Sequence, residues 1–523
     1  MKKKYFIFML ISFLLLSGIF FLLLKDDGKR NPNIILISID TMRADHLGCY
    51  GYGGNTSPNI DEFSKTSVLF EKFFSHSPST TPSHASMLSS LYVLSHGIRA
   101  NAPGFMLSDH VRTLSEVLKE HGYKTAAFTG DAWLSQAYGF SRGFDKWSEK
   151  YRNIPEHLPL VKEWIKNNRE NKFFLFFHFY DVHSPYLYRK ELKKMYQNPG
   201  FTGEIEKLDI KVKKAVKNKE DLEKFFAALS DSEKGIAVLY SYTISLLHKR
   251  LHAGNVQGVI RKNFAIFSKF YREEWEKIPD YTKQLQFLID SYDAGIRKTD
   301  MYIGEFFKFL KKSELWDNTL IILTSDHGEE FMENKKLGHE GNLYDTLLHV
   351  PFIIKMPDNS RGKAKRIAVF AESVDIMPTI LDFLGIYPGS VSQMQGKSVL
   401  GLIENRTSVH KDMVFASVSS RQNQSNPKAM VRNDKIKCIL PSINRFKGFR
   451  FYVIGNDSLT EQQLHNISRQ EKDRLINNLK KHIARCSMLY RGTYSKKRQE
   501  IGKNKKDIPQ EVKKNLKSLG YIN

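Results

Sequence analysis

Two apolar stretches of this chain each lead directly into residues of a type that commonly binds metal ions. Residues 33–39 precede Asp40, and residues 319–324 lead, after one serine, to Asp326 and His327. A continuous run of Val, Ile and Leu is typical of a parallel strand covered on both faces, and the ligands of such sheets collect at the carboxyl ends of the strands. The sequence therefore predicts an α/β fold, in which a mostly parallel sheet is flanked by helices and carries a metal site at its edge.

A hydroxyl-rich segment lies between these two stretches. Thr80 precedes Thr81 and Pro82, and a helix-forming run follows. Because a hydroxyl at the N-cap and a proline in the first turn mark the start of a helix, we expect Thr80 where free backbone N–H groups can bind an anionic ester. Taken alone, Thr80 could be a simple N-cap and Asp40 a turn residue. The Asp326–His327 pair favours a metal site, because polar groups beside a buried sheet need partners.

Several longer motifs occur in order between about residues 33 and 400. They include NIILISIDTMRADHLGCYGY, TTPSHASMLSSLYVLSHGIRAN, FFLFFHFYDVHSPY, NTLIILTSDHGEEF, LGHEGNLYDTLLHVPFIIK and VDIMPTILDFLGI. Together they resemble the sulfatase family of the alkaline-phosphatase superfamily, and linked motifs are more specific than a single one. The resemblance implies an alkaline-phosphatase-like α/β fold with a small C-terminal α+β subdomain, and an enzyme that acts on an anionic ester.

The residue expected to be the nucleophile departs from the family pattern. Sulfatases carry a cysteine or serine there that is oxidised to formylglycine, whereas this chain has Thr80, whose β-carbon bears a methyl group and cannot give that aldehyde. The family's arginine is replaced by His84, its second aspartate by Thr41, and its lysine-bearing segment by residues 130–133. What is left resembles the branch of the superfamily that uses a threonine and a divalent metal on phosphate esters.

We therefore expect a hydrolase or transferase that acts on a phosphate ester or phosphodiester through a covalent phosphothreonine at Thr80. Hydrolysis of a sulfate ester without formylglycine is the first alternative, and an inactive relative that binds an anionic glycan or lipid is the second. A threonine hydroxyl is a weak nucleophile until a base or a metal removes its proton, which favours a metal-dependent reaction.

The resemblance assigns one divalent metal to Asp40, Thr80, Asp326 and His327. Two carboxylates and an imidazole form a mixed oxygen and nitrogen set, which favours Mn²⁺ or Zn²⁺. Ca²⁺ or Mg²⁺ would be favoured by a set of oxygen atoms alone and stays a second choice.

Four other acidic residues occur within these motifs. Asp181 and Glu340 could help neighbouring histidines to hold a second metal, which the spacing leaves open. Glu329 and Glu330 are expected on a solvated face or in a salt bridge rather than on a metal, because acidic side chains are rarely buried without a partner.

Four histidines and one arginine complete the expected site. The resemblance implies that His183 and His339 are catalytic residues next to the ester, and His96, Arg99 and His84 are expected to bind the substrate. A single histidine is more often structural than catalytic, so these roles depend on the motifs in which the residues occur.

The N-terminal region predicts a membrane anchor. Residues 5–24 carry no charge and follow three lysines, and a helix of this length crosses about 30 Å of hydrocarbon. The lysines place the short N-terminal end in the cytoplasm, so residues 1–30 are expected to be a stub and a single retained signal anchor. The catalytic domain is then extracytoplasmic, and cleavage near residues 17–18 would give a secreted form.

Changes of pattern divide the rest of the chain. We expect a catalytic domain at residues 31–400 with a Lys-rich helical insertion at about 189–281, then a C-terminal subdomain and basic tail at 401–523. Further elements are expected as follows: a helix at 284–310, strands at 431–440 and 449–454, and a helix at 471–485.

The net charge of +24 favours anionic partners, namely an ester substrate on an envelope lipid or polymer. Nucleic acid is not expected, because no binding motif is present and the anchor places the domain outside the cell. Three cysteines allow at most one disulfide; a pairing of Cys438 with Cys486 is open, and Cys49 is expected to be a small buried residue.

Overall fold

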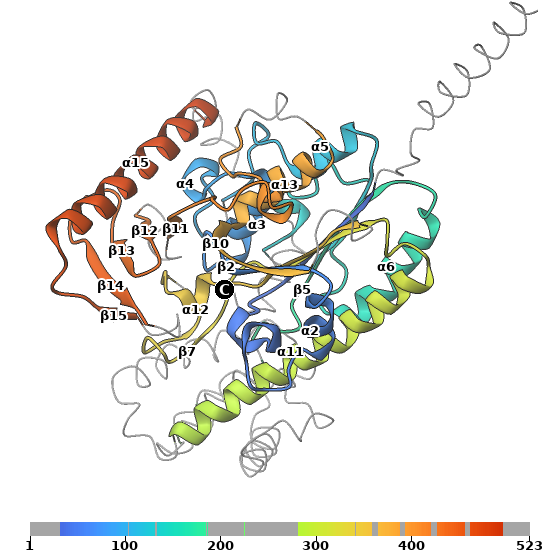
Figure 1. Ribbon diagram of the computed structural model, residues 1–523, viewed down its shortest axis with the longest axis horizontal. Helices are drawn as coiled ribbons and strands as arrows, with labels where there is room; N and C mark the ends of the chain where they lie inside the picture. Colours follow the sequence, from blue (N-terminus) through green and yellow to red (C-terminus); the bar gives the residue numbers. More distant parts are fainter. Residues whose placement is uncertain are drawn as a thin grey trace, which may run out of the picture.

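The computed structural model describes most of the chain between residues 32 and 494 (Figure 1). Within these limits it leaves out residues 103, 131–132, 185, 187–223, 225–227, 229–280, 340, 358–363, 387–392, 420–425 and 456–460. The predicted membrane segment at 5–24, nearly all of the predicted insertion and the basic tail lie outside the described residues. Among the helices that are described, none is long and apolar enough to cross a membrane.

An eight-stranded sheet forms the centre of the molecule. Its strands, in spatial order, are β10 (Lys365–Glu372), β2 (Val68–Phe74), β9 (Phe352–Lys355), β6 (Thr319–Ser325), β1 (Asn33–Ile39), β5 (Phe173–Phe179), β3 (Lys124–Phe128) and β4 (Lys146–Ser148). Strand β9 runs antiparallel to both of its neighbours, and the other paired strands run parallel. Every residue of β1, β5 and β6 is buried, which explains why these strands read as unbroken apolar runs.

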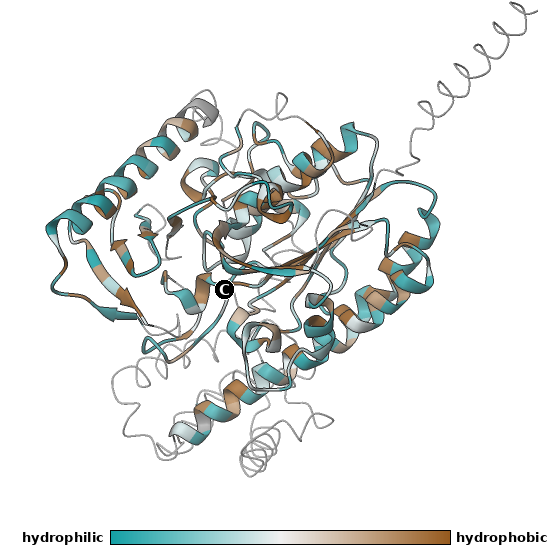
Figure 2. Cartoon of the chain, in the orientation of Figure 1, coloured by the Kyte–Doolittle hydropathy of each residue, from teal (hydrophilic) through white to brown (hydrophobic). Residues whose placement is uncertain are grey.

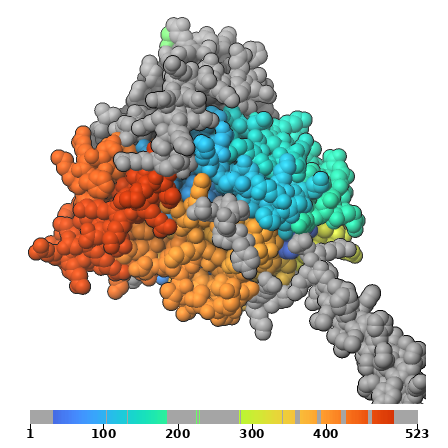
Figure 3. All heavy atoms as spheres, turned by 90° about the horizontal axis from the view of Figure 1, so that it is seen from above, coloured from blue at the N-terminus to red at the C-terminus, as the bar shows by residue number. Residues whose placement is uncertain are grey.

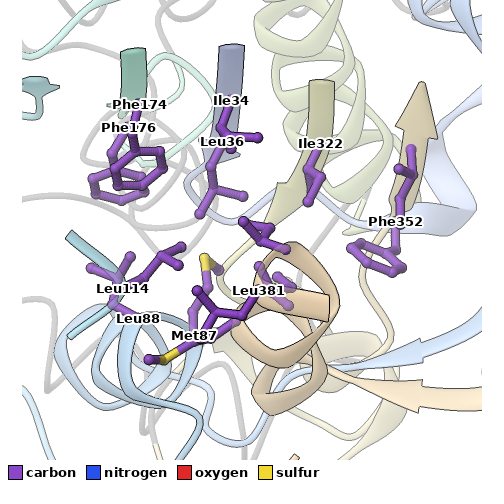
Figure 4. Close-up of a cluster of buried hydrophobic side chains, with 14 of the residues drawn as sticks. Ile34, Leu36, Met87, Leu88, Leu114, Phe174, Phe176, Ile322, Phe352 and Leu381 are labelled. Carbon is purple, nitrogen blue, oxygen red and sulfur yellow. The ribbon is translucent and has the colours of Figure 1, made fainter. Parts of the chain in front are cut away.

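Helices cover both faces of this sheet (Figure 1). One face packs against α2 (Pro58–Ser64), α6 (Ile154–Asn167) and α11 (Tyr281–Lys312), and the other against α3 (Thr80–Ser89), α5 (Leu114–Glu120) and α13 (Ile376–Phe383). Successive side chains of a strand point to opposite faces, so Ile35 and Ile37 join the first layer while Ile34 and Leu36 join the second. Figure 4 shows Ile34 and Leu36 directed toward Met87 of α3. The predicted α/β architecture with a mostly parallel sheet is confirmed.

Helix α11 is the longest of the described helices, and it begins and ends close to the predicted bounds of 284–310. Apolar and polar side chains alternate around it at helical spacing (Figure 2). Its buried side chains Phe287, Tyr292 and Phe306 lie against the central sheet. The helix therefore carries residues to the strand ends where the predicted ligands lie.

A second, antiparallel sheet follows in the C-terminal part. Its strands are β11 (Val414–Val418), β12 (Lys428–Arg432), β13 (Ile436–Leu440), β14 (Arg450–Ile454) and β15 (Glu461–Gln463). The prediction of one strand at 431–440 was wrong, because the chain turns back between β12 and β13. Asn433 makes this turn, since its side-chain oxygen accepts hydrogen bonds from the N–H groups of Lys435 and Ile436.

Helix α15 (Arg469–Tyr494) covers one face of the antiparallel sheet and extends beyond the predicted helix at 471–485. Figure 3 shows the red C-terminal residues gathered at one side of the molecule. Cys438 and Cys486 are both buried in this layer, and all three cysteines are free thiols. Cys49 is half-buried, and burial together with the Asp61 charge raises the pKa of its thiol.

Buried ion pairs join the antiparallel sheet to the short helix α12 (Asp345–Leu348). The carboxylate of Asp345 accepts from Lys437 Nζ at 2.6 Å and from Arg432. Its backbone N–H donates to Glu461 at 2.7 Å. The remaining short elements are α4 (Val93–His96), α14 (Leu400–Ile403), β7 (Glu330–Phe331), β8 (Leu337–Gly338), η1 (Ala44–His46), η2 (Gly48–Tyr50), η3 (Gln136–Tyr138) and η8 (Ser373–Asp375).

Candidate active site

The register of the central strands brings two predicted ligands together. Ile39 at the end of β1 pairs with Ser325 at the end of β6, so the next residues, Asp40 and Asp326, leave the sheet side by side. His327 follows directly. One possible ligand atom from each of Asp40, Asp326 and His327 lies within 4.8 Å of the others, and all three side chains are buried. This geometry can hold a metal ion.

The hydrogen bonds around these side chains leave one atom of each unused. Asp326 Oδ1 accepts from the N–H groups of Thr41 at 3.2 Å and His327 at 2.9 Å. His327 Nδ1 donates to the carbonyl of Gly328 at 2.9 Å, which leaves the lone pair on Nε2. Among the described residues, Asp40 Oδ1, Asp326 Oδ2 and His327 Nε2 have no hydrogen-bond partner. Buried acceptors without partners are costly, so this set fits a divalent cation.

The charges of the group support the same interpretation. Burial raises the pKa of Asp40, and burial together with the Asp40 charge raises the pKa of Asp326. Burial opposes protonation of His327, but the carboxylates of Asp326 and Asp40 outweigh it and raise the pKa of the imidazole. The two carboxylates and the imidazole therefore each hold a proton more tightly than usual, and a bound cation would take the place of these protons.

Two backbone features fix the turns that carry the ligands. A β-carbon on Gly328 would lie 2.1 Å from the carbonyl oxygen of Thr346, so only glycine allows this close approach beside His327. Thr41 has a φ of 57°, which is strained for a β-branched residue. The hydroxyl of Tyr292 on α11 holds that turn, because it donates to the Thr41 carbonyl at 2.8 Å.

Thr80 is the first residue of α3, beside this group. Its Oγ1 lies 3.5 Å from Asp40 Oδ2 and 3.5 Å from Asn101 Nδ2. Ser79, not Thr80, occupies the N-cap position, and its side chain makes no capping hydrogen bond. The hydroxyl of Thr80 therefore points to the ligand group rather than to the helix backbone. Asn101 was missed in the sequence, because nothing local links it to Thr80.

The structure brings His183 and His339 to the same place. Their ring centroids lie 5.0 Å apart, and the His339 ring lies 4.5 Å from that of His327. Both side chains are only slightly exposed, at 8% and 7%. Burial lowers the pKa of His183 to about 4, although the nearby charge of Asp40 acts in the opposite direction. These histidines border the predicted ligands as the resemblance implies.

Of the three predicted substrate-binding residues, His84 lies beside the ligand group, with its Nδ1 3.8 Å from Asp326 Oδ2. His84 is buried between α3 and β1, where Nδ1 bonds to the Thr80 carbonyl at 2.8 Å and Nε2 contacts Ser38 Oγ at 3.0 Å. His96 is buried against Ser86 on α3. The guanidinium of Arg99 lies over the ring of Tyr490, 5.6 Å from its centroid, and so faces α15. His84 thus also holds the Thr80 segment, and the contacts described for His96 and Arg99 are with α3 and α15.

Of the two positions expected for Glu329 and Glu330, the solvated face was wrong, since their exposed fractions are 0% and 1%, whereas Glu329 does pair with a basic side chain, His339. Strands β7 and β8 form a hairpin after His327 that folds both side chains inward. Glu329 Oε1 accepts from His339 Nδ1 at 2.9 Å, and Glu330 Oε2 accepts from Asn342 Nδ2 at 2.9 Å. The two strands have only two residues each, so no periodic pattern in the sequence announced this hairpin.

Asp181, one of the two carboxylates considered for a second metal, has partners within the chain. Asp181 Oδ2 accepts from the N–H of Ile154 at 2.6 Å at the start of α6, and Oδ1 lies 3.4 Å from Lys298 Nζ. Glu340 lies outside the described residues. Within the part of the chain that the structure describes, Asp40, Asp326 and His327 form the one group with metal-ligand geometry.

Two basic residues near Asp40 were also missed in the sequence. His178, on β5, has its Nε2 3.5 Å from Asp40 Oδ2. The guanidinium of Arg152 lies over the ring of Tyr180, 4.9 Å from its centroid, and its charge favours ionised Asp40. The pairing of β1 with β5 accounts for the position of His178, because Ser38 and His178 are register partners.

Comparison with known families agrees with the motifs. The family model described as "Sulfatase" matches residues 32–386, which is more than half of the chain. A second model, "N-sulphoglucosamine sulphohydrolase, C-terminal", matches residues 339–488. The matched ranges include the central sheet, the ligand strands and the C-terminal antiparallel sheet.

Individual relatives match 73% and 77% of this chain. An N-acetylglucosamine-6-O-sulfatase of Bacteroides thetaiotaomicron is 22% identical over 424 residues, covering 73% of this chain and 72% of the relative. An arylsulfatase of Clostridium perfringens is 25% identical over 465 residues, covering 77% and 85%. The crystal structure of a phosphonate monoester hydrolase of Agrobacterium radiobacter aligns with a TM-score of 0.62 at 18% identity, over 88% of this chain and 96% of that one. The last similarity shows a shared fold.

Proposed function

Because this chain belongs to the sulfatase family of the alkaline-phosphatase superfamily, we propose that it is a metal-dependent hydrolase of an anionic ester, with the hydroxyl of Thr80 as nucleophile. One observation carries the proposal: Thr80 Oγ1 lies 3.5 Å from Asp40, within a group of buried ligand atoms that lack hydrogen-bond partners. A nucleophile beside an unsatisfied ligand set is the arrangement that such a reaction requires.

The residues of the chain divide the reaction between them. The N-terminus of α3 directs the positive end of the helix dipole at the ester oxygens, but Pro82 has no N–H, and the N–H groups of Thr81 and Ser83 donate to Asn101 Oδ1 and to the Ser79 carbonyl. The Thr80 hydroxyl donates toward Asp40 Oδ2, passes its proton to that carboxylate and attacks the central sulfur or phosphorus atom. A bond from Thr80 Oγ1 to that atom forms, and the bond from the central atom to the leaving oxygen breaks. Water then cleaves the threonine ester and restores the hydroxyl.

A divalent cation held by Asp40, Asp326, His327 and Thr80 would supply positive charge that lowers the pKa of the hydroxyl and balances charge on the ester oxygens. The leaving oxygen also needs a proton. His339 borders the ligand group and is the side chain suited to supply it, whereas the lowered pKa of His183, about 4, leaves that ring neutral near pH 7.

Two classes of ester fit this site, and a different observation favours each. The relatives are named for sulfate esters, including a 6-O-sulfate of a sugar, and this favours sulfate ester hydrolysis without formylglycine. The threonine at the nucleophile position, which cannot give formylglycine, favours a phosphoryl ester. The relatives give sulfate the broader support, so it is the first substrate class to test.

Location and domain limits stay as predicted from the sequence. We propose a single membrane anchor at residues 5–24, with the catalytic domain at 31–400 and the C-terminal subdomain at 401–523 outside the cytoplasm. The net charge of +24 supports a substrate attached to an anionic lipid or polymer.

The test uses the full chain in detergent, loaded with Mn²⁺ or Zn²⁺ and supplied in turn with a nitrophenyl sulfate, phosphate monoester and phosphodiester. We expect turnover of at least one ester that is lost in Thr80→Ala and largely kept in Thr80→Ser. The neighbouring Thr81 provides the matched control, because its hydroxyl donates to the Trp133 carbonyl and not to the ligand group. Turnover that survives Thr80→Ala would overturn the threonine mechanism, and absence of turnover with every ester would overturn the proposed function.

A further inference from the structure

Glu329 is a fully buried carboxylate to which the reaction above gives no task. Its Oε1 accepts a hydrogen bond from His339 Nδ1 at 2.9 Å, and its Oε2 accepts one from the hydroxyl of Tyr186 at 2.7 Å. In addition, Arg43 donates to the Glu329 backbone carbonyl at 2.9 Å. Both side-chain oxygens and the main chain of Glu329 are therefore held in place.

The histidine that Glu329 holds lies where the ester is expected. The His339 ring is 4.5 Å from the ring of His327 and 5.0 Å from that of His183, measured between centroids. Because Nδ1 donates to Glu329, the ring is fixed in one orientation, and Nε2 lies on its opposite edge. A carboxylate bonded to one imidazole nitrogen selects both the tautomer and the direction of the other nitrogen.

The neighbouring Glu330 shows that burial alone does not give this arrangement. It leaves the same turn and is also buried, but its carboxylate accepts from the side-chain amide of Asn342 at 2.9 Å. No contact with an imidazole is described for it. Glu330 therefore shares the environment of Glu329 without its histidine.

We propose that Glu329 is a positioning residue that acts through His339. With Tyr186 it holds the imidazole so that Nε2 faces the ester bound beside Thr80. The inference rests on the proposed function, because it assumes that an ester occupies this place. Glu329 itself does not touch the substrate.

The first test is a double-mutant cycle on the full chain loaded with metal. Glu329→Gln is expected to lower kcat about 10- to 100-fold with KM changed less than about threefold, since Glu329 orients His339 and does not itself bind the substrate. In a His339→Ala background the same substitution is expected to change kcat less than about twofold, because residues that act as a unit are not additive. Equal losses in both backgrounds would overturn the inference.

Two variants control for a merely structural effect. Glu330→Gln removes a neighbouring buried charge and is expected to leave kcat within about twofold of the parent. Tyr186→Phe keeps the ring but removes the hydrogen bond to Glu329, and is expected to lower kcat less than Glu329→Gln does. A loss of bound metal in Glu329→Gln would overturn the inference, because Glu329 would then support the ligand group instead.

The second test needs no activity. With ¹⁵N-labelled histidine in the Zn²⁺-loaded chain, the His339 signals are assigned by their absence in His339→Ala. Glu329→Gln is expected to shift the Nδ1 resonance of His339, whereas Glu330→Gln is expected to leave it unchanged. An unchanged resonance in Glu329→Gln would overturn the positioning role. If the parent turns over no ester but the resonance shifts, the proposed function fails while the Glu329–His339 contact stands.

Discussion

Asp40 and Asp375 are both fully buried carboxylates, yet their surroundings differ. Asp375 accepts hydrogen bonds from Lys411 Nζ at 2.7 Å, from His410 Nε2 at 3.1 Å and from two backbone N–H groups. Burial opposes its ionisation, but Lys411 and His410 hold its pKa well below the usual range. Asp40, in contrast, has an oxygen with no partner among the described residues and a raised pKa.

A buried carboxylate can stabilise the fold or bind an external cation, and its hydrogen bonds distinguish the two cases. A carboxylate whose oxygens are all paired within the chain belongs to the fold, since the chain alone meets its desolvation cost. A carboxylate that lacks a partner, beside a second such carboxylate and an imidazole, belongs to a site that an external cation completes. A cluster of ligand atoms without hydrogen-bond partners, more than burial, marks the candidate site.

The largest expected effect is the loss of turnover when a carboxylate of the candidate metal site is replaced. Asp326→Asn is expected to lower turnover about 1000-fold and to reduce bound metal, because it removes a ligand charge. After chelation, the same variant is expected to melt at a higher temperature than the parent, because an unpaired buried charge is gone. Turnover, metal analysis and thermal melts check this. A lower melting temperature of the chelated variant would contradict the contrast with Asp375.

The matched change on the paired side should act on stability instead. Asp375→Asn leaves Lys411 with less compensating charge, so the free energy of unfolding is expected to fall by about 3 kcal/mol. Metal content per folded molecule and kcat are expected to stay within about twofold of the parent, because the effect lies outside the ligand group. Denaturant titration with metal analysis measures both, and loss of metal here would show that the two groups are coupled.

The smallest expected effect concerns pH. Burial lowers the pKa of His96 to about 3, and the charges of His76 and Arg99 act in the same direction. The unfolded chain takes up a proton below pH 6.5 while folded His96 stays neutral, so stability falls as pH falls below 6.5. The slope from this residue is about 1.4 kcal/mol per pH unit between pH 6 and 4.

His96→Gln is expected to flatten the pH dependence of unfolding by that slope, as measured by denaturant titration at several pH values. The variant should leave KM unchanged if the contacts of His96 with α3 are its whole role. A raised KM at unchanged stability would restore the sequence expectation that His96 binds the substrate.

The sequence predicted those parts of the site that lie at strand ends. Asp40 and Asp326 each follow a fully buried strand, and a parallel pairing of such strands leaves little freedom for the residues that come next. Thr80 was predicted by the helix signal of the hydroxyls and proline that surround it. The local sequence pattern was enough in these cases, because the strand or helix to which each residue belongs also places its side chain at the edge of the central sheet.

Contacts made by short or distant elements were not predictable in this way. Glu329 meets His339 through a hairpin with only two residues in each strand, and Arg99 meets Tyr490 through the packing of α15. The turn at Asn433 depends on one side-chain oxygen within an otherwise strand-like run. In each case tertiary packing, which no periodic pattern encodes, selected the partner.

Helix α12 has neighbours in both halves of the molecule. Its first residue, Asp345, is bound by two cations of the antiparallel sheet, and the next carbonyl, from Thr346, closes over Gly328 beside the ligand His327. One short helix thus contacts both the C-terminal subdomain and the turn that carries the candidate ligand His327. We therefore expect that removal of the C-terminal part, although it would take away none of the candidate site residues, would displace His327.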